Sequence, residues 1–284
     1  MEGGMGGDWG MNGLRMIGTG LGLLLLLVTG CGRQASTEGA VKPLVIGMDA
    51  TYRPFEFVDE KGEITGVSVE IGKAIGKELG REVVFRNINF DGLILALKTG
   101  SIDLIVSSMT ATEERRKSIA FSDPYVKTGL SVLVGKGSPV KVAEDLKGAG
   151  RKLAVRIGTT GEAWCGEHLP GATLVRLDTD AACVLEVVNG SVDAWVYDQI
   201  SVMNYHRQHA DQTRALLEPL REEFWAVGMA KGADATLGSG VNAALKKMRE
   251  TGAFAGVADR YLAAERELMK AQGLPFVFEL DGSE

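Results

Sequence analysis

The sequence predicts an α/β protein built from two similar lobes, each a doubly wound, mostly parallel sheet. Three observations lead to this fold class. Segments typical of buried strands alternate with segments of helical periodicity. The order then repeats: a helix, Gly190-Ser191 and a buried strand echo the same arrangement around Gly100-Ser101. Two extended apolar segments, residues 129–137 and 224–232, each end in Lys-Gly and are expected to cross between the lobes.

The first lobe begins as strand, helix, strand, helix and strand. These elements are expected at residues 43–48, 67–80, 81–88, 91–100 and 101–108. The first helix carries Val67, Ile71, Ile75 and Leu79 at a spacing of four residues, which places them on one face, and Gly80 is expected to cap its end. Strands that alternate with helices in this way favour a parallel sheet, because parallel strands need a crossover connection.

The second lobe follows the same order. Its strands and helices are expected within residues 146–160, 161–169, 172–179, 180–190 and 191–198, and residues 237–262 supply closing helices of the first lobe. We therefore assign residues 43–130 and 227–284 to a discontinuous first lobe and residues 131–226 to the second. Ligands of such sheets bind beyond the carboxyl ends of the strands, so the cleft between the lobes is the expected site.

Composition sets limits on the function. The chain has 284 residues, of which 45% are hydrophobic and 6% aromatic, and its net charge is −6 at pH 7. This balance is typical of a soluble globular protein. It lacks the basic stripe and the stacking aromatics of a nucleic-acid-binding protein. His206 and His209 have no further His or Cys nearby, so we expect exposed helix residues and neither a metal site nor a cofactor.

Residues 1–31 are interpreted as an export signal. Arg15 precedes an apolar run ending at Val28, which is shorter than a membrane span of about 20 residues and suits a secretory signal. Val28-Thr29-Gly30-Cys31 is similar to the bacterial lipoprotein cleavage box, in which the Cys is lipidated. A plain signal peptide or a core helix is the alternative. We expect an extracytoplasmic chain anchored to a membrane through Cys31, a flexible tether over residues 32–42, and translation from either Met1 or Met11.

Lipidation of Cys31 leaves Cys165 and Cys183 in a compartment where disulfides persist. The two fall on successive helices of the second lobe, and right-handed crossovers can place such helices on opposite faces of a sheet. We expect two buried thiols, with a disulfide between them as the alternative.

Candidate ligand-binding residues follow a strand end of the first lobe. Ser107, Ser108 and Thr110 come after its third strand, followed by Arg115. Thr110 and Glu113 have capping-box spacing, which predicts a helix that starts at Thr110. Arg115 would then lie in a first turn where the helix dipole disfavours a cation. A bound carboxylate, held by hydroxyls and the guanidinium, would explain this placement; a solvated surface arginine is the alternative.

The second lobe offers a matching set. Thr159 and Glu162 form another capping box, and the turn through Gly158, Thr159 and Thr160 offers backbone N–H groups to an anion, although a plain capped helix has the same pattern. Asp198 ends the lobe's third strand. It is a candidate partner for an ammonium group or an N-cap of the next helix.

Aromatic residues follow the first two strands. Tyr52 lies beside Asp49, and Phe90 follows the second strand. Two rings at such loop positions can sandwich an aliphatic stem, although single aromatic residues more often belong to the core.

Together these features resemble a known family. The resemblance is carried by DATYRPFEF, GVSVEIGKAIGKELG, FDGLILALKTGSIDLIVSSMTATEERRKSIAFSDPY, IGTTGEAW, GSVDAWVYD and LKKMRETGAF. These segments are similar to the polar amino-acid-binding proteins of bacterial ABC importers, the extracytoplasmic solute-binding proteins of family 3, from about residue 44 to residue 263. The resemblance implies a two-lobed periplasmic-binding-protein fold of type II with two crossover hinge strands. It also implies a monomer that captures an amino acid and delivers it to permease subunits.

The resemblance implies a role for each candidate residue. Arg115 and Thr110, with the turn at Ser107 and Ser108, match the clamp on the ligand α-carboxylate. Thr160, which follows Thr159, matches the second-lobe donor to that carboxylate, and Asp198 matches the acid that takes the α-ammonium group.

The remaining candidates surround the ligand side chain in this family. Tyr52 and Phe90 match the rings that flank it, and Asp49 and Arg156 match positions that can touch its far end. Asp49 suits a basic or an amide side chain, whereas an inward-pointing Arg156 would repel a cation. The pair therefore favours an amide such as glutamine.

Two alternative functions remain. Some proteins of this fold are dehydratases that act on cyclohexadienyl substrates, prephenate or arogenate, but the position of their catalytic Glu is Ser201 here, which removes the proton donor. Similar lobes also serve as amino-acid sensors.

Overall fold

The structure is a computed structural model that describes residues 42–280. These residues belong to one compact unit. The expected export signal over residues 1–31, the lipidated Cys31, the alternative starts and all of the 32–42 tether except Lys42 lie outside the described residues. Between residues 42 and 280, no helix has both the length and the apolar character needed to span a membrane.

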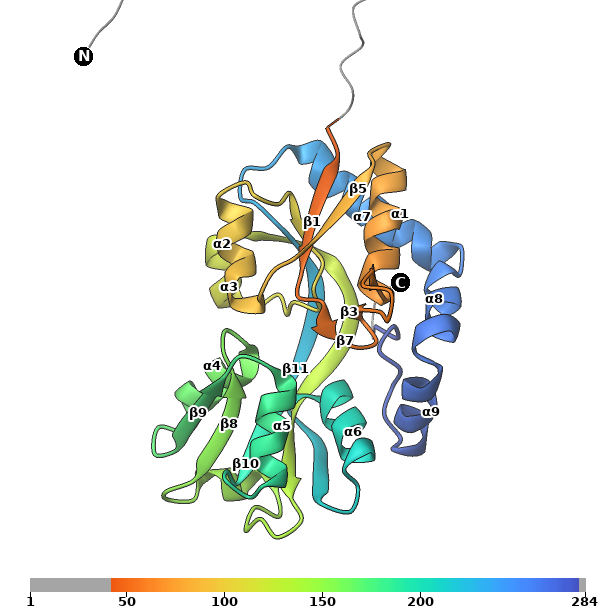
Figure 1. Cartoon of the computed structure of the whole chain (residues 1–284). Coiled ribbons are helices and arrows are strands. Elements are labelled where there is room, and N and C mark those ends of the chain that lie inside the picture. The colour runs from red at the N-terminus through yellow and green to blue at the C-terminus, as the bar shows by residue number, and fades with distance from the viewer. Residues whose placement is uncertain (1–41, 281–284) are drawn as a thin grey trace, which may run out of the picture. The chain divides into compact units, whose positions relative to one another are not determined.

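A mixed eight-stranded sheet runs in the order β5-β1-β6-β11-β7-β10-β8-β9 (Figure 1). The strands are β1 (Leu44–Met48), β5 (Val83–Asn87), β6 (Leu104–Ile105), β7 (Ala120–Gly135), β8 (Lys152–Arg156), β9 (Thr173–Leu177), β10 (Ala194–Asp198) and β11 (Thr213–Met229). Strands β5, β1 and β6 pair in parallel, as do β10, β8 and β9. Each parallel triplet forms the centre of one lobe, so the predicted two-lobed α/β fold is confirmed.

The long strands β7 and β11 connect the two triplets (Figure 1). They pair antiparallel with each other, β11 also pairs with β6, and β7 also pairs with β10. Their register shifts between Leu216 and Arg221. The predicted crossing segments overlap these strands but are shorter than the strands themselves. The proposed lobe boundaries, 130/131 and 226/227, fall inside β7 and β11 and stay a prediction.

Helices cover both faces of each triplet, as in a doubly wound sheet. They are α1 (Val67–Leu79), α2 (Leu93–Lys98), α3 (Glu113–Ser118), α4 (Thr160–His168), α5 (Asp180–Val188), α6 (Gln199–Gln208), α7 (Ala235–Glu250), α8 (Ala253–Tyr261) and α9 (Ala263–Ala271), with 3-10 turns η1 (Phe90–Gly92) and η2 (Ala143–Lys147). Ile71 of α1 packs in one core cluster of the first lobe and Leu93 of α2 in another. Gly80 adopts φ 62° and ends α1, as predicted.

The two described cysteines lie in different core clusters of the second lobe. Cys165 of α4 packs in one cluster and Cys183 of α5 in the other, and both thiols are buried and free. The expected pair of buried thiols is therefore confirmed. Burial raises the pKa of each thiol to about 12, which keeps both in the unreactive thiol form.

The predicted helix start at Thr110 is wrong by two residues. Helix α3 begins at Glu113, and the Oγ1 of Thr112 caps it by accepting the N–H of Arg115 at 3.2 Å. Thr110 instead forms an isolated antiparallel bridge with Trp225 of β11. Because α3 has only six residues, Arg115 lies as close to its last turn as to its first, and the helix dipole does not disfavour it as expected.

A small antiparallel sheet follows β1. It consists of β2 (Thr51–Tyr52), β3 (Glu56–Val58) and β4 (Ile64–Thr65). Strands of two or three residues are too short to show periodicity, so the sequence gives no signal for them. This sheet carries Tyr52 and Glu56, which both face the pocket described below.

Candidate functional site

All eleven candidate residues line one pocket between the lobes. It encloses about 440 Å³ of space, part of it open to solvent. The candidates in its wall are Asp49, Tyr52, Phe90, Ser107, Ser108, Thr110, Arg115, Arg156, Thr159, Thr160 and Asp198. Glu56, Tyr197, Glu223 and Trp225 also line it. The pocket therefore brings the whole predicted set together, while its role in binding a ligand stays a prediction.

The parallel strands position these residues at their carboxyl ends. Asp49 follows β1, Phe90 opens the turn after β5, and Ser107 follows β6. In the second lobe, β8 ends at Arg156 and β10 ends at Asp198. Neighbouring parallel strands end at the same edge of a sheet, so residues far apart in the chain meet there.

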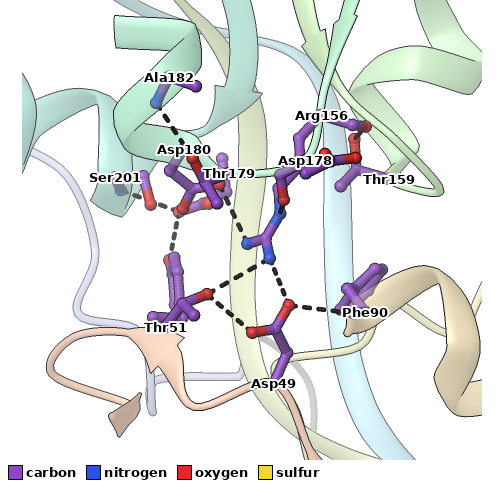
Figure 2. Close-up of polar contacts among 12 residues, drawn as sticks. Asp49, Thr51, Phe90, Arg156, Thr159, Asp178, Thr179, Asp180, Ala182 and Ser201 are labelled. Carbon is purple, nitrogen blue, oxygen red and sulfur yellow. Dashed lines mark hydrogen bonds and ion pairs between the residues drawn. The ribbon is translucent and has the colours of Figure 1, made fainter. Parts of the chain in front are cut away.

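The Arg156 guanidinium lies at the centre of an ion-pair network that joins the lobes (Figure 2). Its Nη1 donates to Asp180 at 3.1 Å, its Nη2 donates to Asp49, and its Nε donates to the Asp178 carbonyl at 3.1 Å. The Arg156, Asp49 and Asp180 side chains are buried. Burial lowers the pKa of Arg156, but Tyr197, Asp180 and Asp49 raise it by more, so the guanidinium stays charged.

Asp49 is held in place by three further hydrogen bonds. Its Oδ1 accepts the Thr51 hydroxyl at 2.8 Å, and its Oδ2 accepts the Phe90 N–H at 3.0 Å. Its own N–H donates to the Ser107 hydroxyl at 2.9 Å. Asp49 and Arg156, both predicted near the far end of a ligand side chain, thus bind each other, and Ser107 supports Asp49.

Asp198 takes one of the two roles that the sequence left open, the N-cap of α6, while its role as partner of an ammonium group stays a prediction. Its Oδ1 accepts the Ser201 N–H at 3.0 Å, so it caps α6, and also accepts the Tyr52 hydroxyl from the first lobe at 2.8 Å. Burial raises the pKa of Asp198 to about 6, against the lowering effect of these hydrogen bonds. The carboxylate is therefore mostly ionised at pH 7.

Arg115 reaches from the first lobe to the second. Its Nη1 donates to the Thr110 carbonyl at 2.8 Å and its Nη2 to the Gly158 carbonyl at 3.0 Å. Its guanidinium carbon lies 5.3 Å from the centre of the Phe90 ring, within reach of a cation–π interaction. Burial lowers the pKa of Arg115 to about 10, and Glu223 opposes this shift. Arg115 thus supplies a fixed positive charge to the pocket.

The helix start predicted at Thr159 is confirmed, but only half of the capping box forms, because Glu162 accepts from Gly158 rather than from the Thr159 N–H. The Oγ1 of Thr159 accepts the Glu162 N–H at 3.4 Å, and the Glu162 carboxylate accepts the Gly158 N–H at 2.9 Å. The Thr159 N–H donates to the Arg156 carbonyl. Two of the three backbone N–H groups that the sequence offered to an anion are therefore occupied, and the Thr159 hydroxyl donates to the Arg156 carbonyl at 2.7 Å.

Glu223 of β11 is a pocket residue that the sequence analysis did not identify. Its side chain is 2% exposed. One carboxylate oxygen, Oε2, accepts the hydroxyls of Thr110 and Thr160, each at 2.9 Å, and the other accepts Arg221 Nη2 at 2.6 Å. Glu223 thus contacts hydroxyls from both lobes.

Glu56 of β3 is the second acid that the sequence analysis missed. It is 1% exposed and accepts the hydroxyls of Ser68 at 2.6 Å and Ser108 at 3.0 Å. Burial raises the pKa of Glu56 to about 8, so this carboxyl is mostly protonated at pH 7. Ser108 has φ 47°, a conformation that non-glycine residues rarely adopt and that clusters at functional sites.

A signal for Glu223 was present in the sequence, whereas Glu56 lies in the three-residue strand β3, which is too short to show periodicity. Glu223 precedes Trp225 and Val227 at alternate positions of one strand, so it shares their buried face. An acid at a buried position of a strand needs a polar partner, and that pattern points to a functional site.

Family and sequence comparisons agree with this geometry. The model of the bacterial extracellular solute-binding proteins, family 3, matches residues 44–264. The L-cystine-binding protein TcyJ of Escherichia coli (strain K12) is 29% identical over 224 residues, 78% of this chain and 83% of that protein. The ABC transporter glutamine-binding protein GlnH of Bacillus subtilis (strain 168) is 30% identical over 249 residues, 81% of this chain and 90% of that protein.

Solved structures show the same two-lobed fold. A mutant of ArgBP from T. maritima superposes with a TM-score of 0.71 at 36% identity, covering 78% of this chain and 95% of that chain. The ancestral amino acid-binding protein AncCDT-1, a precursor of cyclohexadienyl dehydratase, gives a TM-score of 0.69 at 35% identity, covering 77% and 94%. These relatives are binding proteins rather than enzymes. With its matched segment, its fold and its pocket, this chain belongs to family 3 of the bacterial extracellular solute-binding proteins.

Proposed function

We propose that this protein is the substrate-binding component of an amino-acid ABC importer, which captures a polar L-amino acid between its lobes and delivers it to permease subunits. One observation carries the proposal. A half-buried cation with neighbouring hydroxyls, Arg115, and a buried anion, Asp198, come from different lobes and line the same pocket.

The charges of a free amino acid explain why such a pair is needed. Its carboxylate and ammonium groups lose strong hydration when the lobes enclose them, so each must meet opposite charge or fixed donors. Arg115, Thr110 and Thr160 supply donors for the carboxylate, and Asp198 accepts from the ammonium group. Contacts to both lobes stabilise the closed state in proportion to the ligand's preference for that state.

The Tyr52 hydroxyl is the group most directly affected by ligand entry. It now donates to the Asp198 oxygen at 2.8 Å. An ammonium group that binds Asp198 shares or replaces this bond, while the Ser201 N–H continues to hold the carboxylate from the other side. Tyr52 and Phe90 would flank the ligand side chain between them.

The glutamine preference rests on the pair Asp49 and Arg156 and stays a prediction. An amide can accept from Arg156 and donate to Asp49. Arginine is a second candidate, because Arg156 has two carboxylate partners, Asp49 and Asp180. One positive and two negative charges leave this end of the pocket with no net repulsion for a guanidinium group.

The cellular setting belongs to the same proposal. We expect a monomer held outside the cytoplasm by a lipid on Cys31. Membrane fractionation of wild type and Cys31→Ser checks the anchor: the wild type should pellet with membranes and the variant should not. Equal distribution of the two would remove the lipid anchor from the proposal.

Enzyme and sensor functions remain the alternatives. Ser201, which stands where the related dehydratases carry a catalytic Glu, donates its backbone N–H to Asp198 at the first turn of α6. A serine hydroxyl is a poor general acid at neutral pH, which weighs against dehydration chemistry. Turnover of prephenate or arogenate by the purified protein would overturn the binding assignment. A sensor requires a signalling partner, whereas an importer component requires a permease.

A thermal-shift panel of the twenty amino acids tests the proposal. The protein is first unfolded and refolded to remove any copurified ligand. A ligand that binds only the folded state at one hundred times its Kd adds about 2.7 kcal/mol of stability, and so raises the melting temperature by several degrees. We expect a shift with glutamine or arginine. If none of the twenty shifts the melting temperature, the protein is not an amino-acid-binding component.

A further inference from the structure

Glu223 holds the hydroxyls that the proposed function gives to the ligand. Thr110 approaches it from the first lobe and Thr160 from the second, and both donate to the same carboxylate oxygen at 2.9 Å. Its other oxygen accepts Arg221 Nη2 at 2.6 Å. A buried carboxylate therefore already takes these donors from both lobes.

A hydroxyl group has one proton to donate. While Thr110 and Thr160 donate to Glu223, neither can donate to a ligand carboxylate. The Arg115 guanidinium is close enough for Glu223 to raise its pKa, yet its two bonded nitrogens donate to the Thr110 and Gly158 carbonyls. Glu223 thus presents to this part of the pocket the same chemical group as the α-carboxylate of an amino acid.

We propose that Glu223 is a resident competitor of the ligand carboxylate, which sets the affinity of the pocket by holding both threonine hydroxyls until a ligand displaces it. This inference rests on the proposed function, since it uses the same carboxylate site. Ligand binding must turn both threonine O–H groups from the Glu223 carboxylate to the ligand carboxylate. Ligand binding must also bring a second negative charge close to Glu223, and the repulsion between the two carboxylates makes the free energy of binding less favourable.

Removal of this competing charge should tighten binding. In Glu223→Gln the side chain keeps its shape but loses its charge, so the hydroxyls are held less strongly, because hydrogen bonds to ionised acceptors are about twice as strong as neutral ones. Arg115 also loses a nearby anion and attracts a ligand carboxylate more strongly. We expect the Kd for the amino acid found in the panel to fall roughly tenfold, the change that about 1.4 kcal/mol produces.

Glu222→Gln is the matched control. Glu222 is the adjacent acid of the same strand, its side chain is 61% exposed, and it pairs with Lys127 at 3.1 Å. The substitution removes the same charge one residue away without touching either threonine. We expect its Kd to stay within about twofold of wild type, since the Glu222 side chain is exposed and solvent screens its charge.

A carboxyl-blocked ligand separates competition from a structural role. The α-amide of the same amino acid has no carboxylate, so the gain of Glu223→Gln over wild type should disappear with it. If Glu223 instead only holds the two threonines in place, its substitution should weaken the amino acid and its α-amide alike. Calorimetry with both ligands on wild type and on the two variants measures the difference.

The possible outcomes distinguish the proposed function from the competitor role of Glu223. If wild type binds no amino acid at all, the proposed function fails and takes this inference with it. If wild type binds but Glu223→Gln binds equally or more weakly, only the competitor role of Glu223 is overturned. Should Glu223→Gln fail to fold, Glu223→Asp replaces it. The shorter side chain draws the carboxylate away from both hydroxyls, so binding should again tighten. Unchanged or weaker binding overturns the inference.

Discussion

Substitution of Arg156 tests the ion-pair network that joins the lobes. In Arg156→Gln, the Asp49 and Asp180 carboxylates stay buried, at 6% and 5% side-chain exposure, but lose their shared cation. Removal of one partner from a buried ion pair destabilises a protein by about 3–5 kcal/mol, because a buried charge is left uncompensated. For a chain of this length that corresponds to a melting temperature roughly 6–20 °C lower. Burial raises the pKa of Asp180 to about 7 even beside Arg156, so the loss should shrink as the pH falls below that value and this carboxylate takes up a proton.

Arg176→Gln provides the comparison for this change. Arg176 donates to Glu162 at 2.6 Å, but its side chain is 55% exposed, so we expect a loss below about 1 kcal/mol. Both variants are followed by thermal and urea unfolding of the ligand-free protein at pH 7 and pH 4.5. Addition of Asp180→Asn to Arg156→Gln should restore part of the stability by removing one stranded carboxylate. Equal stability of Arg156→Gln and Arg176→Gln at pH 7 would refute the reasoning.

Three further predictions concern stability and reactivity. Burial raises the pKa of Glu56 from 4.5 to about 8, so between these pH values the folded state binds more protons than the unfolded state, and the free energy of unfolding should fall as the pH rises. In Glu56→Gln, urea unfolding should show this slope reduced by up to ~1.4 kcal/mol per pH unit. An unchanged slope would contradict the raised pKa of Glu56. A Cβ on Gly161 of α4 would collide with a backbone carbonyl of β10, so Gly161→Ala should lower the free energy of unfolding by about 1–3 kcal/mol. A Cβ on Gly166 of the same helix would meet open space, so Gly166→Ala should raise the free energy of unfolding by up to about 1 kcal/mol. The reverse order would show that this helix packs differently. The thiols of Cys165 and Cys183 should react with a thiol reagent only in urea, and reaction of either in the folded protein would contradict their burial.

Much of the fold could be predicted from the sequence because it follows from periodicity. Alternating strand and helix signals predicted both parallel triplets, and residues near strand ends predicted most of the candidate set, whereas Asp49 and Arg156 were implied by the family resemblance. Asp198 was found this way, since the end of a parallel strand is a local feature of the chain.

The parts that could not be predicted depend on contacts between distant residues. Asp49 and Arg156 are 107 positions apart, and nothing local shows that they bind each other rather than a ligand. Glu223 lies on a crossing strand rather than at a strand end, so a search of strand ends passes over it. The misplaced start of α3 has the same cause. Two threonines two residues apart, Thr110 and Thr112, both suit a cap, and only the pairing of Thr110 with β11 decides between them.

The central claim is that Arg115 holds the carboxylate of an amino acid whose ammonium group meets Asp198 from the other lobe. Calorimetric titration of Arg115→Ala with the amino acid found in the panel tests it most directly, with Arg116→Ala as the control because Arg116 is exposed and pairs only loosely with Glu113, at 3.9 Å. The account predicts a loss of at least ~2 kcal/mol for Arg115→Ala, roughly thirtyfold weaker binding, and less than about threefold for Arg116→Ala. Near-wild-type affinity of Arg115→Ala would contradict it.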